Sequence, residues 1–451
     1  MNKIHFVSLG CARNLVDSEV MLGILLKAGY EATESLKEAD FLIVNTCGFL
    51  AESRQESADT IDYLLREKKK TAKVVVAGCM VQKYGKEVRQ QFPHVHYFLG
   101  SGDMEKILEA IESPSSGDAV TSAKSYLESG EVPRQVSTPK HYAYLKIAEG
   151  CLKRCSFCII PTIKGALKSK DEDQVVKEFQ LLLKQGVREV ILIAQDLGDY
   201  AKDRKVKDGL TALLKRMLKT PEPFWLRLLY LYPDEITDEL IDLIQSNERI
   251  CPYLDMPLQH ISDPMLRAMR RKTNKAQIID TLTKLRTKIP HIVIRTSLMV
   301  GFPGETEEQF EELLDFVKKY PLDNVGILKY SKEDESHSAT LPDHISEDLK
   351  QSRFERLVAA QKKSVQKNNK KYIGKTLQVV VEGYHPDSEL LMRGRFYGQC
   401  PEIDGQVIIN DGRKIKAFGE LYNVEITDVM EYDLIGRAVS SVKAKAKLCL
   451  V

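Results

Sequence analysis

The stretch EGCLKRCSFCIIP, residues 149–161, follows an apolar segment and places Cys151, Cys155 and Cys158 in the spacing C-x3-C-x2-C. A structural zinc site normally has four protein ligands, and this stretch holds no fourth cysteine or histidine. A cubane iron–sulfur cluster can be held by three thiolates, so that its fourth iron stays open to a substrate or cofactor. The spacing therefore predicts such a cluster. A zinc knuckle, or a group of reduced surface thiols, is the alternative.

Three short apolar runs in the N-terminal third each end in a cysteine: HFVSLGC at Cys11, FLIVNTC at Cys47 and KVVVAGC at Cys79. Such runs are typical of strands buried on both faces, and helix-like segments such as residues 18–28 and 55–69 lie between them. This alternation predicts an α/β domain with a parallel sheet, whose strands all end along one edge. Each cysteine alone would be a small buried hydrophobic residue. Three cysteines, each at the end of an expected strand, predict a second metal site.

The middle of the chain repeats the alternation of strands and helices. A stretch rich in Ser, Gly and Pro, residues 113–138, precedes it and indicates a linker. The six β/α units that follow predict an incomplete TIM-like (β/α)6 barrel, in which the chemistry lies at the carboxyl ends of the strands. The expected strands are residues 142–148, 189–194, 225–230, 253–258, 291–298 and 324–330.

Polar or glycine-rich segments follow several of these expected strands. Gln195 and Asp196 follow the second strand, and GFPGET, residues 301–306, follows the fifth. A glycine-containing loop that opens a helix can bring backbone N–H groups close to a ligand. The same residues could instead cap the next helix. His260, after the fourth strand, is expected to be structural.

The pattern changes after a charged helix expected at residues 347–368. From about residue 374, short alternating runs with Gly and Asp-Gly turns (TLQVVVEG, LLMRGRFYG, GQVIINDG and AFGELYNVEITDV) predict a small antiparallel β-barrel. Residues 375–437 hold seven basic and eleven acidic side chains, a net charge of 7 − 11 = −4. An acidic body repels phosphate backbones and suits a basic protein partner.

The composition is that of a multidomain enzyme. At roughly 150 residues per domain, 451 residues predict about three domains. The 66 basic and 64 acidic residues leave a net charge of +2, which favours neither a nucleic acid nor a membrane as partner. Nine cysteines without a credible secretion signal indicate the reducing cytoplasm, and metal binding in place of disulfides.

With these motifs the chain resembles the radical S-adenosylmethionine (SAM) methylthiotransferases over essentially its whole length. The resemblance rests on C-x3-C-x2-C with Phe157 before its third cysteine, on NTCG at residues 45–48, on AGC at residues 77–79 and on GFPGET. It implies a SAM-binding 4Fe-4S cluster on Cys151, Cys155 and Cys158, and an auxiliary 4Fe-4S cluster on Cys11, Cys47 and Cys79. The SAM contacts expected from it are Phe157, Gln195, Asp196, Gly301, Gly304 and Glu305.

Members of this family act either on an adenosine of tRNA or on an aspartate of the small-subunit ribosomal protein S-twelve. WLRLLYLYP at residues 225–233 and PEIDG at residues 401–405 look like the ribosomal-protein type, and the acidic C-terminal part, which resembles a TRAM domain, agrees with a basic protein substrate. The expected activity is transfer of a methylthio group to the aspartate β-carbon. The expected substrate contacts are Tyr230, Tyr232, Glu402 and Asp404.

Three alternatives stay open at this point: a tRNA adenosine methylthiotransferase, a radical-SAM enzyme with other sulfur chemistry, and a non-catalytic iron–sulfur or zinc scaffold. The resemblance further implies a low-potential electron donor of the flavodoxin or ferredoxin type, a sulfur donor, and no membrane partner. The expected domains are residues 1–125 for the auxiliary cluster, 137–370 for the radical-SAM barrel and 374–441 for the TRAM-like barrel.

Overall fold

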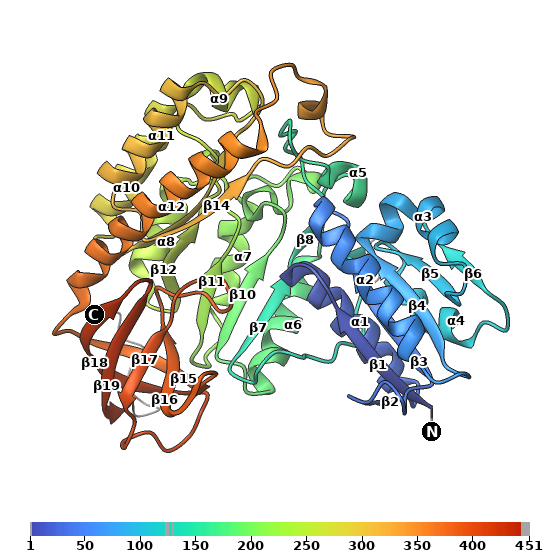
Figure 1. The fold of residues 1–451 in the computed structure, drawn as a ribbon. Coiled ribbons are helices and arrows are strands. Elements are labelled where there is room, and N and C mark those ends of the chain that lie inside the picture. The colour runs from blue at the N-terminus through green and yellow to red at the C-terminus, as the bar shows by residue number, and fades with distance from the viewer. Residues whose placement is uncertain (1, 122–125, 129, 443–451) are drawn as a thin grey trace.

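The computed structural model describes residues 2–121, 126–128 and 130–442, which form three main sheets in chain order (Figure 1). The first of them is entirely parallel, as predicted. Its strands and helices are β1 (Lys3–Ser8), α1 (Ala12–Lys27), β2 (Glu31–Ala32), β3 (Phe41–Thr46), α2 (Ala51–Glu67), β4 (Lys73–Gly78), α3 (Cys79–Gln91), β5 (Tyr97–Gly100), α4 (Ile107–Glu112) and β6 (Gly117–Ala119). The strand order is β2-β1-β3-β4-β5-β6, so the three strands that precede cysteines are direct neighbours.

Helices cover both faces of this sheet. Leu42 and Val44 of β3 pack in one core with α2 and α3, whereas Ile43 between them packs in another with α1 and α4. Successive side chains of a strand point to opposite faces, so a strand covered on both sides has to be apolar throughout. This explains the uninterrupted apolar runs of the sequence.

The second sheet is the expected open barrel of six parallel strands, in the order β7-β10-β11-β12-β13-β14. Its strands are β7 (Tyr142–Lys146), β10 (Glu189–Ile193), β11 (Trp225–Leu228), β12 (Ile250–Asp255), β13 (Val293–Val300) and β14 (Asn324–Lys329), with a small two-stranded sheet of β8 (Ala148–Glu149) and β9 (Lys168–Ser169). Its helices are α5 (Ile160–Lys164), α6 (Glu172–Lys184), α7 (Gly209–Met217), α8 (Asp238–Ser246), α9 (Asp263–Ala268), α10 (Lys275–Lys288), α11 (Glu307–Lys319) and α12 (Glu347–Asn369).

The third sheet is a closed barrel in the order β15-β16-β17-β19-β18. Its strands are β15 (Thr376–His385), β16 (Ser388–Phe396), β17 (Val407–Asp411), β18 (Glu420–Met430) and β19 (Asp433–Ser441). The sequence predicted four strands in an antiparallel arrangement. The structure adds β19, which closes the barrel and pairs in parallel with β17, while the remaining pairs are antiparallel.

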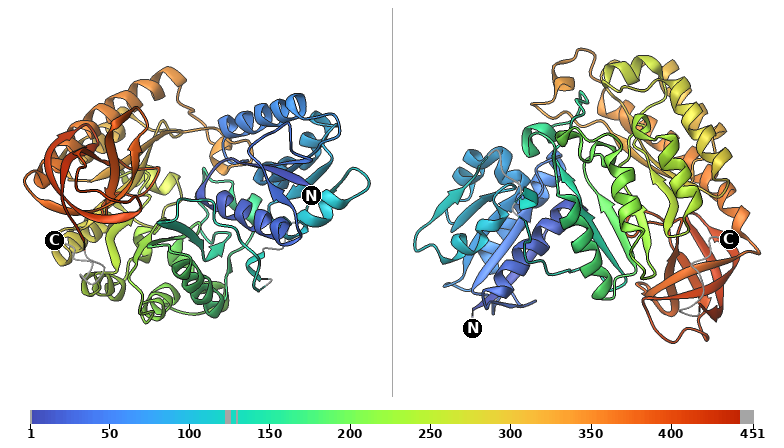
Figure 2. Two further views of the ribbon diagram at one scale, coloured as in Figure 1. Left: turned by 90° about the horizontal axis from the view of Figure 1, so that it is seen from below. Right: turned by 180° about the vertical axis from the view of Figure 1, so that it is seen from behind.

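The C-terminal barrel covers the amino ends of the middle strands. Glu189, the first residue of β10, forms ion pairs with Arg227 of β11 at 2.6 Å and with Arg395 of β16 at 2.9 Å. On the other side, α1 packs along β7, where Asp17 and Lys146 form a buried ion pair. The N-terminal sheet and the C-terminal barrel therefore lie on opposite sides of the middle barrel (Figure 2). No helix in the part of the chain that the structure describes could cross a membrane.

Candidate iron–sulfur site

The N-terminal cysteines gather at one edge of the first sheet. Cys47 and Cys79 directly follow β3 and β4, and Cys11 precedes α1 on the neighbouring strand connection. Gly10 has a φ of +91°, and a Cβ there would lie 3.0 Å from the Cβ of Cys47. Glycine at this position therefore lets the Cys11 loop approach the end of β3.

Asn14 holds these strand ends together, although no sequence motif pointed to it. Its Nδ2 donates to the carbonyl oxygens of Leu9 and Thr46, both at 3.0 Å, and its Oδ1 accepts from the thiol of Cys79 at 3.5 Å. One amide thus connects the ends of all three strands that carry the predicted ligands.

The second set of cysteines lies in the loop between β8 and α5. The backbone N–H of Lys153 donates to the sulfur of Cys151 at 3.3 Å, and that of Ile160 donates to the sulfur of Cys158 at 3.5 Å. Cys155 is approached from other parts of the barrel: the Arg271 guanidinium, between α9 and α10, lies 3.5 Å from its sulfur, and the Tyr232 hydroxyl, after β11, lies 3.4 Å from it. Donors directed at sulfur are typical of the surroundings of iron–sulfur clusters, where they tune the potential.

The spacing of the sulfurs argues against a single-ion site. Among the described residues, one group of three Cys, His, Asp or Glu side chains has all its possible ligand atoms within 4.8 Å, and it consists of Asp196, Asp199 and Glu235. Neither cysteine set is that compact. Three thiolates on one zinc would lie about 3.8 Å apart, because Zn–S bonds are about 2.3 Å long in a tetrahedral site. The wider spacing suits a cluster of several irons better than a zinc knuckle.

Burial keeps most of these thiols protonated in the protein alone. It raises the pKa of Cys79 and of Cys151 to about 12, and that of Cys158 to about 11. Burial also acts to raise the pKa of Cys11, but the Arg13 guanidinium and nearby backbone N–H groups outweigh it, and the pKa is lowered. Only the thiolate form binds a metal, so these sites suit a cationic centre that displaces protons as it binds.

Buried polar groups lie beside the second set, around Lys153. Its ammonium group contacts the carboxylates of Asp196 at 3.3 Å and of Glu235 at 2.5 Å, with Asp199 and Asp234 also within reach. Burial raises the pKa of Asp196 to about 7 despite the lysine. A site with more carboxylates than ammonium groups suits a ligand that brings donors or positive charge.

Two buried amide oxygens support the same conclusion. The Oε1 atoms of Gln195 and Gln259, at the ends of β10 and β12, are buried and have no hydrogen-bond partner. A buried acceptor is normally satisfied, so both suit a ligand with N–H and O–H groups, such as the amino group and ribose of SAM. Gln195 was among the expected contacts. Gln259 was not, and its left-handed φ of 71° is the sign of a special position.

In the GFPGET loop, the carboxylate of Glu305 is turned into the protein. Glu305 is 2% exposed, and its carboxylate accepts from the backbone N–H of Gly301 at 2.7 Å, pairs with Arg353 at 2.8 Å and contacts His260 at 3.1 Å. Both oxygens are thus used inside the protein, where Glu305 holds the loop, and its expected contact with SAM stays a prediction. His260 is structural, as predicted. Gly301 and Gly304 have left-handed φ values of 76° and 79°.

The expected substrate residues divide between the two ends of the barrel. Tyr232 lies beside Cys155, and Tyr230 adopts a left-handed φ of 61° at the same edge. Glu402 and Asp404 lie at the opposite end, where they accept from the hydroxyl groups of Tyr142 at 2.9 Å and Tyr253 at 2.7 Å.

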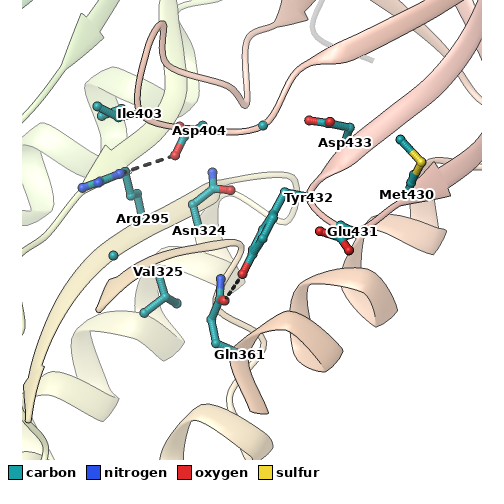
Figure 3. A pocket seen from close by; sticks show the side chains of 12 residues that line it. Arg295, Asn324, Val325, Gln361, Ile403, Asp404, Met430, Glu431, Tyr432 and Asp433 are labelled. Carbon is teal, nitrogen blue, oxygen red and sulfur yellow. Dashed lines mark hydrogen bonds and ion pairs between the residues drawn. The ribbon is translucent and has the colours of Figure 1, made fainter. Parts of the chain in front are cut away.

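The Asp404 side chain is 1% exposed, because it closes the junction of the barrels beside Arg295. Both carboxylates thus have intramolecular partners, and the substrate role expected of Glu402 and Asp404 stays a prediction. A cavity of about 650 Å³ lies at this junction. Figure 3 shows its lining side chains, among them Tyr432, whose hydroxyl donates to Gln361. None of the six cysteines lines it.

Phe157 is half-buried and packs with a small apolar cluster that includes Met269 and Phe302. It lies on the loop that carries Cys155 and Cys158, so its ring supports that loop from the side of the GFPGET segment. This position agrees with a place near the cofactor.

Three family models match consecutive parts of the chain: "Uncharacterized protein family UPF0004" over residues 3–100, the radical SAM superfamily over residues 145–317 and the TRAM domain over residues 373–439. A ribosomal protein uS12 methylthiotransferase RimO from Protochlamydia amoebophila is 64% identical over 440 residues, which cover 97% of this chain and 93% of that protein. The protein of the same name from Bdellovibrio bacteriovorus is 44% identical over 447 residues, 97% of each.

Among solved structures, the radical S-adenosylmethionine methyltransferase TsrM from Kitasatospora setae, with cobalamin and a 4Fe-4S cluster bound, aligns with a TM-score of 0.54 at 16% identity. The alignment covers 74% of this chain and 73% of that one, and it shows a shared fold.

Proposed function

The chain belongs to the RimO family of ribosomal protein uS12 methylthiotransferases, and from this membership we propose that it adds a methylthio group to the β-carbon of an aspartate in uS12. Its cofactors are two 4Fe-4S clusters and SAM. The observation that carries the proposal is the presence of two separate three-cysteine sets, one at the ends of neighbouring strands of the first sheet and one in the loop between β8 and α5. Each set is one protein ligand short of the four that would close a cluster.

We assign the SAM-binding cluster to Cys151, Cys155 and Cys158, and the auxiliary cluster to Cys11, Cys47 and Cys79. When bound, these cofactors supply radical cleavage of SAM, sulfur and a methyl group. The protein's part is to position them. Backbone N–H groups donate to the sulfurs of Cys151 and Cys158, and the Tyr232 hydroxyl lies within hydrogen-bond distance of Cys155. Asn14 ties the auxiliary set to its sheet.

For SAM itself we propose contacts to Gln195, Gln259, Asp196, Phe157 and the backbone of the Gly301–Gly304 turn. The unsatisfied amide oxygens of the two glutamines support this assignment. For the substrate we propose Tyr230 and Tyr232, which lie at the same edge as the cysteines.

We further propose that residues 1–125, 137–370 and 374–441 act as the auxiliary-cluster, SAM and TRAM domains. Cleavage of SAM needs one electron, so a low-potential donor of the flavodoxin or ferredoxin type has to dock, and a sulfur donor has to replenish the sulfur that is used. A ribosomal protein substrate and free thiols both suit the cytoplasm, where cysteines stay reduced.

The test is the intact mass of uS12 after anaerobic incubation with the reconstituted chain, SAM, sulfide and reductant. We expect uS12 to gain one methylthio group in place of one hydrogen. Replacing Cys151, Cys155 and Cys158 by Ala should abolish SAM cleavage, whereas the same change at Cys11, Cys47 and Cys79 should leave cleavage and stop methylthiolation. Cys251→Ala is the matched control, because this buried thiol lies outside both sets. Unmodified uS12 with a methylthiolated tRNA would instead favour the tRNA enzyme.

A further inference from the structure

Arg13 lies where the N-terminal sheet meets the middle barrel. It is the second residue of α1, between the ligand Cys11 and the connecting residue Asn14. Its Nη1 donates to the carbonyl oxygen of Ala194 at 2.9 Å, one residue before Gln195, and its guanidinium lies 5.0 Å from the centre of the Tyr230 ring. The side chain thus reaches from the first sheet to the carboxyl ends of two barrel strands.

The charge of Arg13 acts on both cysteine sets. It interacts with the sulfurs of Cys11 and Cys79. Burial raises the pKa of Cys158 and the Arg13 guanidinium works against that rise. By its place two residues after Cys11 and by its hydrogen bond to Ala194, this guanidinium lies between the Cys11 loop and the carboxyl ends of the barrel strands. The reacting carbon of a substrate has to lie between the two cysteine sets.

Arg13, which is half-buried, differs from four interior arginines of the chain in having no carboxylate partner among the described residues, a property it shares with Arg271. Arg134, Arg227, Arg353 and Arg395 each form an ion pair with a carboxylate. Over residues 2–121, 126–128 and 130–442, no carboxylate lies within ion-pair distance of Arg13. A guanidinium has five N–H donors arranged as a planar fork, and its preferred partner is a carboxylate bound by two parallel hydrogen bonds.

We propose that Arg13 binds the side-chain carboxylate of the target aspartate and so positions its β-carbon between the two cysteine sets. This inference rests on the proposed function. The β-carbon is bonded directly to the carboxylate carbon, so a fork that holds both oxygens also fixes the direction of the β-hydrogens. Arg13 is then a specificity-determining residue that selects aspartate over its neutral isostere asparagine.

SAM also carries a carboxylate, which is the other possible partner for this guanidinium. Arg271 offers that carboxylate a cation of its own, because it lies 3.5 Å from the sulfur of Cys155 and 4.0 Å from the centre of the Tyr232 ring, within the SAM-side set. Arg13 lies two residues after Cys11 of the auxiliary set and donates to the carbonyl oxygen of Ala194. This division favours the substrate for Arg13.

The experiment uses the full chain with both clusters reconstituted, and two forms of uS12, one with the target aspartate and one with asparagine there. Binding is measured by fluorescence anisotropy of labelled uS12, together with SAM cleavage and iron content. Charged hydrogen bonds support a preference of roughly tenfold to a hundredfold for aspartate. Arg13→Gln should remove most of that preference, and Arg13→Lys should keep part of it, when all proteins are compared at equal iron content per chain.

Arg249→Gln is the matched control. Arg249 also donates to backbone carbonyls, among them Thr220, and lies 5.0 Å from the Phe224 ring centre, but at the opposite end of the barrel. The Arg249→Gln variant should keep the full preference for aspartate. The inference is overturned if Arg13→Gln keeps the preference, or if it loses SAM cleavage or iron while the preference stays. If the wild type fails to methylthiolate uS12 at all, the proposed function itself is refuted.

Discussion

Replacing Glu189 by Gln should loosen the C-terminal barrel from the middle barrel without touching the chemistry. Glu189 is 1% exposed and pairs with Arg227 and Arg395. Arg227 also donates to the carbonyl oxygen of Tyr397, and Arg395 donates to that of Gln399 and pairs with Glu382 at 2.7 Å. The variant would leave two buried arginines without their shared anion. Breaking a buried pair from one side typically costs about 3–5 kcal/mol.

The pKa of Glu189 supports a free-energy cost of this size. Burial alone would raise this pKa, but the two guanidinium groups lower it from 4.5 to about 2. A decrease of that extent corresponds to about 3 kcal/mol in favour of the ionised folded form. Because the folded pKa lies below the unfolded one, this stability is fully present above about pH 4.5 and is lost as the pH falls toward 2. The difference in free energy of unfolding between wild type and variant should therefore shrink as the pH falls below about 4.5.

The chain carries its own probe for this junction. Its single tryptophan, Trp225, begins β11 and is buried in the core that the two barrels share. Urea unfolding of the metal-free protein, followed by Trp225 fluorescence at pH 7 and at lower pH, measures the effect. Glu425→Gln is the control, since its pair with Arg437 is solvent-exposed and such pairs contribute only about 0–1 kcal/mol. Equal midpoints for the two variants, or a difference that persists on acidification, would refute the reasoning.

Three further outcomes follow from the site. Asp196→Asn should raise the melting temperature at pH 8 and weaken SAM binding. Burial raises the pKa of this carboxyl to about 7, so the wild type loses stability as the pH rises from about 4 to 7. In thermal scans, the melting temperatures of wild type and variant should therefore become equal at acid pH. Tyr232→Phe removes a hydroxyl 3.4 Å from the Cys155 sulfur and should lower the reduction potential of that cluster in a spectroscopic titration, with iron content unchanged. Asn14→Ala should lose the iron of the auxiliary set alone, so retention of all iron in elemental analysis contradicts its role in holding that edge.

The cysteine sites could be predicted because local patterns determine them. Apolar runs that end in Cys11, Cys47 and Cys79 indicate parallel strands, and strand ends in such a sheet have to meet. In the sheet, the three strands that precede these cysteines are direct neighbours, as the repeated sequence pattern implied. The strand β19 escaped notice because Gly436 and Arg437 interrupt its apolar alternation, and only closure of the barrel gives it partners.

Single residues that act through distant contacts could not be predicted. Arg13, Gln259 and Arg271 belong to no pattern, and each matters only because separate strand ends converge on it. The burial of Asp404 could not be predicted from the sequence either. A net charge counts acidic groups without telling which of them face water, and the ion pair and tyrosine hydroxyl that bury this carboxylate come from another sheet.

The two cysteine sets also differ in what each requires of the folded chain. The loop of residues 151–158 keeps its three thiols within eight residues of one another, so even an unfolded segment can capture iron there. The auxiliary thiols come together only once three strands have paired, so that binding energy is coupled to the folding of a whole domain. Iron should therefore enter the loop early and the sheet edge late as the chain matures. Mild denaturant should release it in the reverse order.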